Sequence, residues 1–293
     1  MLDRPHSYLQ LKLMINTFTH IINSLGRAHI TVSLIVLISF IQLSCDDESA
    51  DSAAENSPLS GAELEEARSL FQGRFALRVK TTTEQELPVV GLARSTSYTD
   101  KLITISESEG VFSAEEQFCE VRMETEGPAN PSVPRALVES IPTFTTSLKL
   151  IQRDGEWEWE RSRSGLVLGA QLNDPLNDPL PSEADDERVY DQDMDGNPGV
   201  TLSVSGLVEG DIYTVIRYVD TLSGRVTSDG VWEGITRDET EQLVIGASQD
   251  VLKINVTPMV VEGPSLNIVT AIPISTEDGC TQAMDALKTY FSE

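Results

Sequence analysis

The chain has 293 residues, a formal net charge of −26 and three histidines, His6, His20 and His29. A surface so acidic repels nucleic acid and anionic lipid headgroups, which excludes proteins that bind either through a basic face. Beyond residue 29 the chain contains no histidine, and this excludes from that part His-based catalytic triads and zinc sites that need an imidazole.

Residues 30–44 form an apolar run without a charge, which follows Arg27 and ends at Cys45. Such a run after a basic residue is typical of a secretion signal, and it is short for a membrane-spanning helix, which needs about 20 apolar residues. The acidic residues that begin directly after Cys45 differ from the Lys and Arg cluster of a stop-transfer signal. Met14 is an alternative start of this signal.

Leu43, Ser44 and Cys45 resemble the lipobox of bacterial lipoproteins, with Gln42 where that family usually has Leu or Val. The resemblance implies that residues 1–45 are a signal peptide and that Cys45 carries a lipid. The protein would then be anchored in the bacterial cell envelope through this lipid. An ordinary secretory signal and an uncleaved anchor are the alternatives.

Residues 46–60 are acidic and small, which predicts a flexible tether in front of a domain over residues 61–293. The domain begins with an expected helix over residues 62–72, where Leu64, Ala67 and Phe71 recur at helical spacing. A second helix, capped by Thr276, is expected at the end of the chain, with one face formed by Cys280, Ala283, Met284, Leu287 and Phe291.

Between these helices, apolar and polar residues alternate in about a dozen short runs, beginning with Phe75, Leu77 and Val79. One run covers residues 251–256, and Ser223-Gly224 is among the expected turns. The pattern predicts an all-β fold, either an antiparallel barrel or a two-sheet sandwich with a short N-terminal helix and a C-terminal helix.

An acidic loop rich in proline, residues 173–199, interrupts the strands. Two halves, residues 61–172 and 200–293, are therefore an alternative organisation. Gly73-Arg74-Phe75 resembles the GxW motif at the start of lipocalin-like barrels, with Phe75 in place of Trp. This resemblance implies a calycin-like carrier of a small apolar ligand.

If Cys45 carries a lipid, Cys119 and Cys280 remain as an even pair in an oxidising compartment. A disulfide between them is the leading prediction. Two buried free thiols or a redox pair are the alternatives, although no CxxC spacing favours redox chemistry.

Asp191, Asp193 and Asp195 alternate with single residues and are followed by Gly196. Alternating carboxylates before a glycine let a loop wrap oxygen ligands around a hard cation such as calcium. The array resembles the calcium loops of EF-hands and of thrombospondin type 3 repeats.

A standard EF-hand is excluded, because Leu202 stands at the twelfth position of the loop, where that family has a bidentate Glu. The remaining ligands would come from the Asn197 carbonyl, from water or from the acidic residues 185–187. The alternative is a solvated acidic turn.

Trp157 and Trp159 are two residues apart and so share one face of a strand, where they would either pack in the core or line a ligand cavity. The chain lacks the GxSxG and HExxH motifs. The leading prediction is a non-enzymatic envelope lipoprotein that binds an unknown protein or small-molecule ligand and is stabilised by calcium. A calycin-like carrier and a hydrolase that uses carboxylates alone are the alternatives.

Overall fold

The computed structural model describes residues 58–87, 91–127, 129–255, 258–263 and 265–292. They belong to one compact unit that spans residues 54–293. The predicted signal, Cys45 and residues 46–57 of the tether lie outside the described residues. Within the described part of the chain, no helix is both long enough and apolar enough to cross a membrane.

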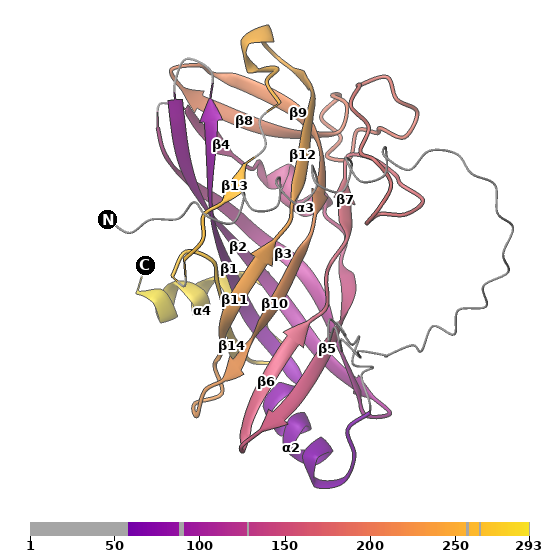
Figure 1. Ribbon diagram of the computed structural model, residues 1–293, viewed down its shortest axis with the longest axis vertical. Helices are drawn as coiled ribbons and strands as arrows, with labels where there is room; N and C mark the ends of the chain where they lie inside the picture. The colour runs from indigo at the N-terminus through magenta and orange to yellow at the C-terminus, as the bar shows by residue number, and fades with distance from the viewer. Residues whose placement is uncertain (1–57, 88–90, 128, 256–257, 264, 293) are drawn as a thin grey trace, which may run out of the picture. The chain divides into compact units, whose positions relative to one another are not determined.

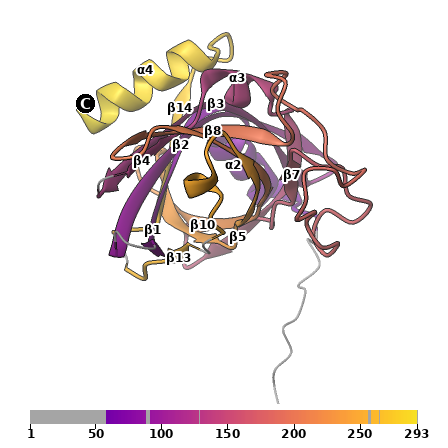
Figure 2. The same ribbon diagram turned by 90° about the horizontal axis from the view of Figure 1, so that it is seen from above.

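Eight antiparallel strands close into a barrel in the order β1–β14–β11–β10–β6–β5–β3–β2, and β2 pairs again with β1 (Figures 1 and 2). These strands are β1 (Gly73–Leu87), β2 (Gly91–Ser108), β3 (Val111–Glu126), β5 (Phe144–Arg153), β6 (Glu156–Arg161), β10 (Asp220–Val226), β11 (Trp232–Asp238) and β14 (Ile268–Ile274). Strand β13 (Met259–Val260) pairs with the far end of β1. The all-β prediction is confirmed, and of its two forms the structure has the barrel, joined by a second sheet.

The second sheet has the order β12–β9–β8–β4, and β7 also pairs with β9. Its strands are β4 (Ala129–Ser132), β7 (Leu166–Leu168), β8 (Val200–Gly206), β9 (Gly210–Tyr218) and β12 (Glu241–Ala247). The chain on either side of the loop 173–199 contributes strands to both sheets.

Apolar side chains fill one part of the barrel interior, because alternate residues of each strand point inward. On β1 these are Phe75, Leu77 and Val79, all about 3 % exposed. Helix α2 (Gly61–Phe71) lies within the ring of strands when the barrel is seen from above (Figure 2). Its Phe71 is fully buried, with its ring centroid 5.0 Å from that of Trp232. The predicted N-terminal helix is confirmed to within one residue.

Two further helices pack outside this interior. Helix α4 (Cys280–Phe291) lies against the outer face of the barrel, where Ala283 and Leu287 join a buried cluster with barrel residues such as Leu102 (Figure 1). Helix α3 (Arg135–Ser140) buries Leu137 against the second sheet.

The expected cap at Thr276 is wrong, because α4 begins at Cys280. Residues 275–278 form a turn instead, in which the Asp278 carboxylate accepts the N–H of Ser275 at 3.0 Å. The Gln282 side chain accepts the N–H of Gly279 at 3.1 Å. A local side-chain contact therefore delays the start of the helix by one turn.

Two further local predictions are wrong. Ser223-Gly224 lies inside β10 rather than in a turn, and a Cβ atom on Gly224 would lie 2.0 Å from the Glu233 carbonyl oxygen of β11. The glycine thus permits close approach of two strands. The strand expected at residues 251–256 is instead a 3₁₀ helix, η1 (Asp250–Leu252), followed by Asn255, whose side chain bonds the backbone of Val244.

Candidate functional site

The loop of residues 173–199 packs over one face of the second sheet. Its Leu180 and Val189 share a buried cluster with Val215 of β9 and Ile245 of β12. Gly199 ends the loop at a φ of +83°, where a Cβ atom would lie 2.4 Å from the Thr214 carbonyl oxygen. Irregular structure was predicted here, and the packing fixes the position of the loop.

Asp191, Asp193 and Asp195 converge within this loop. One ligand oxygen of each carboxylate lies within 4.8 Å of those of the other two. Asp191 accepts the N–H groups of Asp195 and Gly196 at 3.1 and 2.8 Å. These bonds fold the loop back on itself, so the three side chains predicted from their spacing do meet.

The carboxylates are tied to the second sheet through Thr201 of β8. Asp193 Oδ2 accepts the Thr201 N–H at 2.9 Å, and Asp195 Oδ2 accepts the Thr201 hydroxyl at 2.6 Å. Asn197 donates its N–H to Asp195 Oδ1 at 2.8 Å. These hydrogen bonds from Thr201 and Asn197 outweigh burial and lower the pKa of Asp195.

Asp193 is the central residue of the cluster. Its side chain is 8 % exposed, and its buried Oδ1 oxygen has no hydrogen-bond partner. Burial, together with the charges of Asp195 and Asp191, raises the pKa of Asp193. A buried acceptor without a partner costs about 1–3 kcal/mol, so a hydrogen-bond donor or a cation beside this oxygen would stabilise the fold.

The cluster fits a hard cation. Two oxygens bound to one calcium ion at 2.3–2.6 Å lie at most about 5 Å apart, which agrees with the separation of the ligand oxygens. Carboxylate oxygens are the ligands that calcium prefers. The three aspartates could therefore hold a metal ion.

Gln192, between two of these aspartates, connects the loop to neighbouring elements. Its side-chain oxygen accepts the Gly169 N–H at 2.8 Å, next to β7. Its side-chain nitrogen donates to the carbonyl of Ser140, the last residue of α3, at 3.3 Å. An ordered loop thus contacts three parts of the domain.

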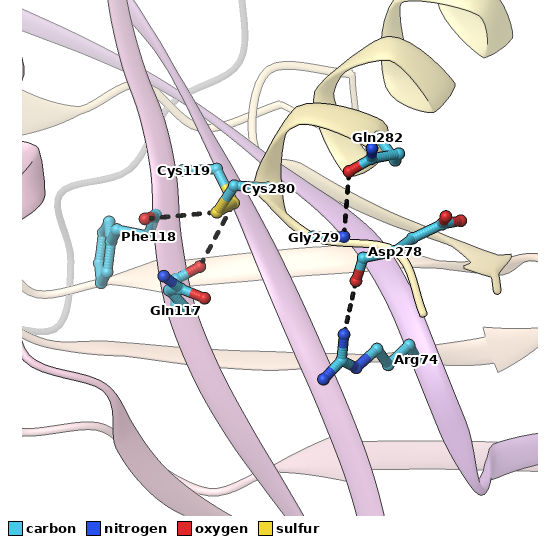
Figure 3. The surroundings of a disulfide bond; sticks show 8 residues. All are labelled: Arg74, Gln117, Phe118, Cys119, Asp278, Gly279, Cys280 and Gln282. Atoms are coloured by element: carbon cyan, nitrogen blue, oxygen red, sulfur yellow. Dashed lines mark hydrogen bonds between the residues drawn. A yellow bond between two sulfur atoms is a disulfide. The ribbon is translucent and has the colours of Figure 1, made fainter. Parts of the chain in front are cut away.

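The structure contains the predicted disulfide between Cys119 and Cys280 (Figure 3). It joins β3, at a bulge opposite Asp100 and Lys101 of β2, to the first residue of α4. Arg74 supports the same connection by donating to the Asp278 carbonyl at 2.6 Å (Figure 3).

Trp157 and Trp159 lie in the barrel interior and are 3 and 2 % exposed. The Trp157 ring centroid is 5.9 Å from that of Phe71, and the Trp159 centroid is 5.3 Å from that of Trp232. Both indoles therefore pack within the aromatic core, as the first of the two interpretations of this pair expects.

Sequence reasoning missed a buried ionic network next to this core. Lys101, Glu116, Arg161 and Asp220 are each at most 3 % exposed. Glu116 lies 2.9 Å from Lys101 Nζ and 3.2 Å from Arg161 Nε, and Arg161 in turn lies 2.6 Å from Asp220. Two cations thus meet two carboxylates in an alternating chain across the barrel.

Neutral side chains complete the network. Thr146 donates to Glu116 at 2.9 Å, and Asp220 accepts the hydroxyls of Ser164 and Tyr218 at 2.7 and 2.8 Å. The Lys101 ammonium lies over the ring of Phe118, 4.6 Å from its centroid. Such contacts offset part of the cost of burying four charges, which is several kcal/mol for each ion.

The pKa values within the network reflect this balance. Burial alone would raise the pKa of Asp220, but Lys101, Arg161 and the hydrogen bonds outweigh it and lower the value to about 2. Burial raises the pKa of Tyr218 well above its usual value. Asp238, which faces Asp220 across β10 and β11, has its pKa raised mainly by burial. Asp220 therefore stays ionised at neutral pH.

The strand period contains a signal for these charges. Lys101 stands two residues before Ile103, and Glu116 two residues after Ala114. Arg161 likewise follows Trp159, and each of these apolar partners is buried in the barrel. Residues two positions apart on a strand share a face, so each of these charged residues is expected to point into the barrel interior like its apolar neighbour.

No protein-family model, curated protein or solved structure matches this chain.

Proposed function

We propose that this chain is a lipid-anchored binding module of the bacterial cell envelope, stabilised by one calcium ion in the loop of Asp191, Asp193 and Asp195. The unpartnered buried oxygen of Asp193 carries the calcium part of the proposal. Calcium would take carboxylate oxygens from all three residues and the rest of its shell from water and the Asn197 carbonyl.

The surroundings of the loop support a structural role for the ion. The carboxylates bond to Thr201 of β8, and Gln192 bonds to Gly169 and Ser140. An ion that fixes the loop would therefore hold together the second sheet and the end of α3. Binding of a ligand to the folded state alone also stabilises it, by about 2.7 kcal/mol at a hundred times the dissociation constant.

Thermal unfolding of the purified chain with calcium and with a chelator tests this proposal. We expect calcium to raise the melting temperature of the wild type by several degrees, since stabilisation of 1 kcal/mol shifts a domain of this size by about 2–4 °C. In Asp193→Asn, which removes the central charge, calcium should have almost no effect.

Asp154→Asn is the matched control, because Asp154 lies in an exposed turn at a φ of +54° that Asn tolerates well. This variant should respond to calcium as the wild type does. Equal melting temperatures of the wild type in calcium and in chelator would refute the calcium site.

A further inference from the structure

A gap in the barrel wall lies beside the buried ionic network. Residues 148–153 of β5 pair with residues 156–161 of β6. Beyond this ladder, hydrogen bonds between Ser147 and Ser162 still join the two segments. Further along, Ser164 turns away from β5 and donates its N–H to the Asp220 carbonyl at 3.0 Å. The strand ladder therefore opens between Thr145 and the segment 163–165.

A cavity of about 260 Å³ occupies this gap. Phe144 and Leu166 provide apolar surface. The polar side chains of its wall belong to Thr145, Thr146, Ser147, Ser162, Arg163 and Ser164. Cavities that hold drug-sized ligands measure about 300–1,000 Å³, so this one fits a smaller molecule, of the size of one sugar ring.

The network behind the cavity fixes the direction of two hydroxyls. Thr146 gives its proton to Glu116, and Ser164 gives its proton to Asp220 while it accepts the Asp220 N–H at 3.1 Å. Neither hydroxyl therefore has a proton left to donate to a ligand, and each can only accept. Ser162 accepts the Ser147 N–H at 3.1 Å, which leaves its own proton free to donate.

We propose that this cavity binds a neutral polyhydroxylated molecule of monosaccharide size. Hydroxyl groups both donate and accept, so they match a wall that combines acceptors, such as Thr146 and Ser164, with donors, such as Ser162. Lys101 and Arg161 balance the carboxylates behind Thr146 and Ser164, and Arg163 on the wall pairs with Glu239 at 2.7 Å. Neither a cation nor an anion therefore meets an unbalanced charge.

The apolar part of the wall suits the same ligand class. Phe144 is held in place by Phe118, whose ring centroid is 6.1 Å away, and by the Lys101 ammonium at 5.5 Å. A fixed ring beside fixed hydroxyls can receive the C–H face of a sugar while its edges form hydrogen bonds. If the chain is a binding module, as proposed above, a small polyhydroxylated molecule is then the class of ligand that it binds.

Saturation-transfer NMR on the purified full chain, in a detergent without a sugar headgroup, tests this inference. The probes are D-glucose, D-galactose, N-acetyl-D-glucosamine and myo-inositol. We expect saturable binding of at least one of them. In Thr146→Val, which keeps the shape but removes one acceptor, binding should weaken by roughly tenfold.

Thr143→Val is the matched control, because Thr143 is exposed just before β5 and does not line the cavity. It should bind as the wild type does. Ser162→Ala serves as a second test variant outside the buried network, and it should weaken binding without a large change in melting temperature.

Absence of saturable binding for all four probes, or equal affinities of Thr146→Val and Thr143→Val, would overturn the inference. A calcium titration of the same preparations separates this outcome from failure of the proposed function. If the wild type binds calcium but no sugar, only the proposed class of ligand is contradicted. If the wild type does not respond to calcium, the proposed cation site is contradicted.

Discussion

Two buried carboxylates, Asp193 and Asp220, differ in what surrounds them. Asp220 accepts hydrogen bonds from Arg161, Ser164 and Tyr218, whereas Oδ1 of Asp193 has no partner. Both Asp220 oxygens are therefore partnered within the chain, although Arg161 Nε in the same network has only its ion pair with Glu116 at 3.2 Å. Asp193 belongs to a cluster that could hold a metal ion at this unpartnered oxygen.

Asp220→Asn should lower the free energy of unfolding by about 3–5 kcal/mol, because it leaves the Arg161 guanidinium buried without its second carboxylate. Urea unfolding measures this change. Glu160→Gln is the control, since Glu160 precedes Arg161 on β6 and is exposed. A cost no larger than that of the control would contradict the role of the network.

The same residue predicts a pH dependence. The folded pKa of Asp220 is about 2, below its ordinary value of 3.8, so its ionised form stabilises the fold above pH 4. We expect a contribution of about 2 kcal/mol to be lost as the pH falls from about 4 to 2. The difference in unfolding free energy between the wild type and Asp220→Asn should shrink over this interval. A constant difference would contradict the lowered pKa.

The sequence alone predicts a candidate site when its residues lie close together in the chain. The aspartates at positions 191, 193 and 195 are one residue apart, and a loop can bring them together by itself. Lys101, Glu116, Arg161 and Asp220 meet only because four strands distant in the sequence pair in one barrel. No local pattern contains that pairing.

At the level of elements, alternation of apolar residues identified most strands, and helical spacing identified α2 and α4. The expected cap at Thr276 is wrong because of a local side-chain contact, whereas the other two wrong predictions occur where a tertiary contact replaces a local preference. Gly224 faces Gly234 across two close strands, and the Asn255 side chain pairs with Val244 of β12. Glycine is common in turns, so the local pattern favours a turn at Ser223-Gly224. At residues 251–256 the local pattern instead favours a strand, which the structure replaces with a 3₁₀ helix and the side-chain contact of Asn255.

The disulfide is a covalent crosslink between the start of α4 and β3 of the barrel. Replacing Cys119 and Cys280 by Ser should lower the free energy of unfolding by about 2–5 kcal/mol, because a crosslink across 161 residues restricts the unfolded chain. Urea unfolding of the double variant measures this loss. Reductant should lower the stability of the wild type by a similar amount and leave the variant unchanged. A variant as stable as the oxidised wild type would contradict this role.

At the level of the whole molecule, the sequence pattern did not distinguish a barrel from a two-sheet sandwich. Closure depends on β1, which pairs with β14 on one side and with β2 on the other, and strand composition does not encode these partners. The second sheet was likewise outside the reach of local patterns, since β4 pairs with β8 across the loop of residues 173–199.

The predicted anchor concerns the whole molecule as well. Cys45→Ser should move the protein from the membrane fraction to the soluble fraction, because it removes the proposed site of lipid attachment. Fractionation with immunodetection measures the distribution, and the Asp154→Asn variant should stay in the membrane fraction. Retention of Cys45→Ser with the membrane would contradict lipidation at this residue.

Native mass spectrometry of the chain, purified without chelator and then equilibrated with calcium, tests the central claim most directly. We expect one calcium ion per wild-type chain and none on Asp193→Asn under the same conditions. Wild-type protein without bound calcium, or equal loading of the wild type and the variant, would contradict a cation site formed by Asp191, Asp193 and Asp195.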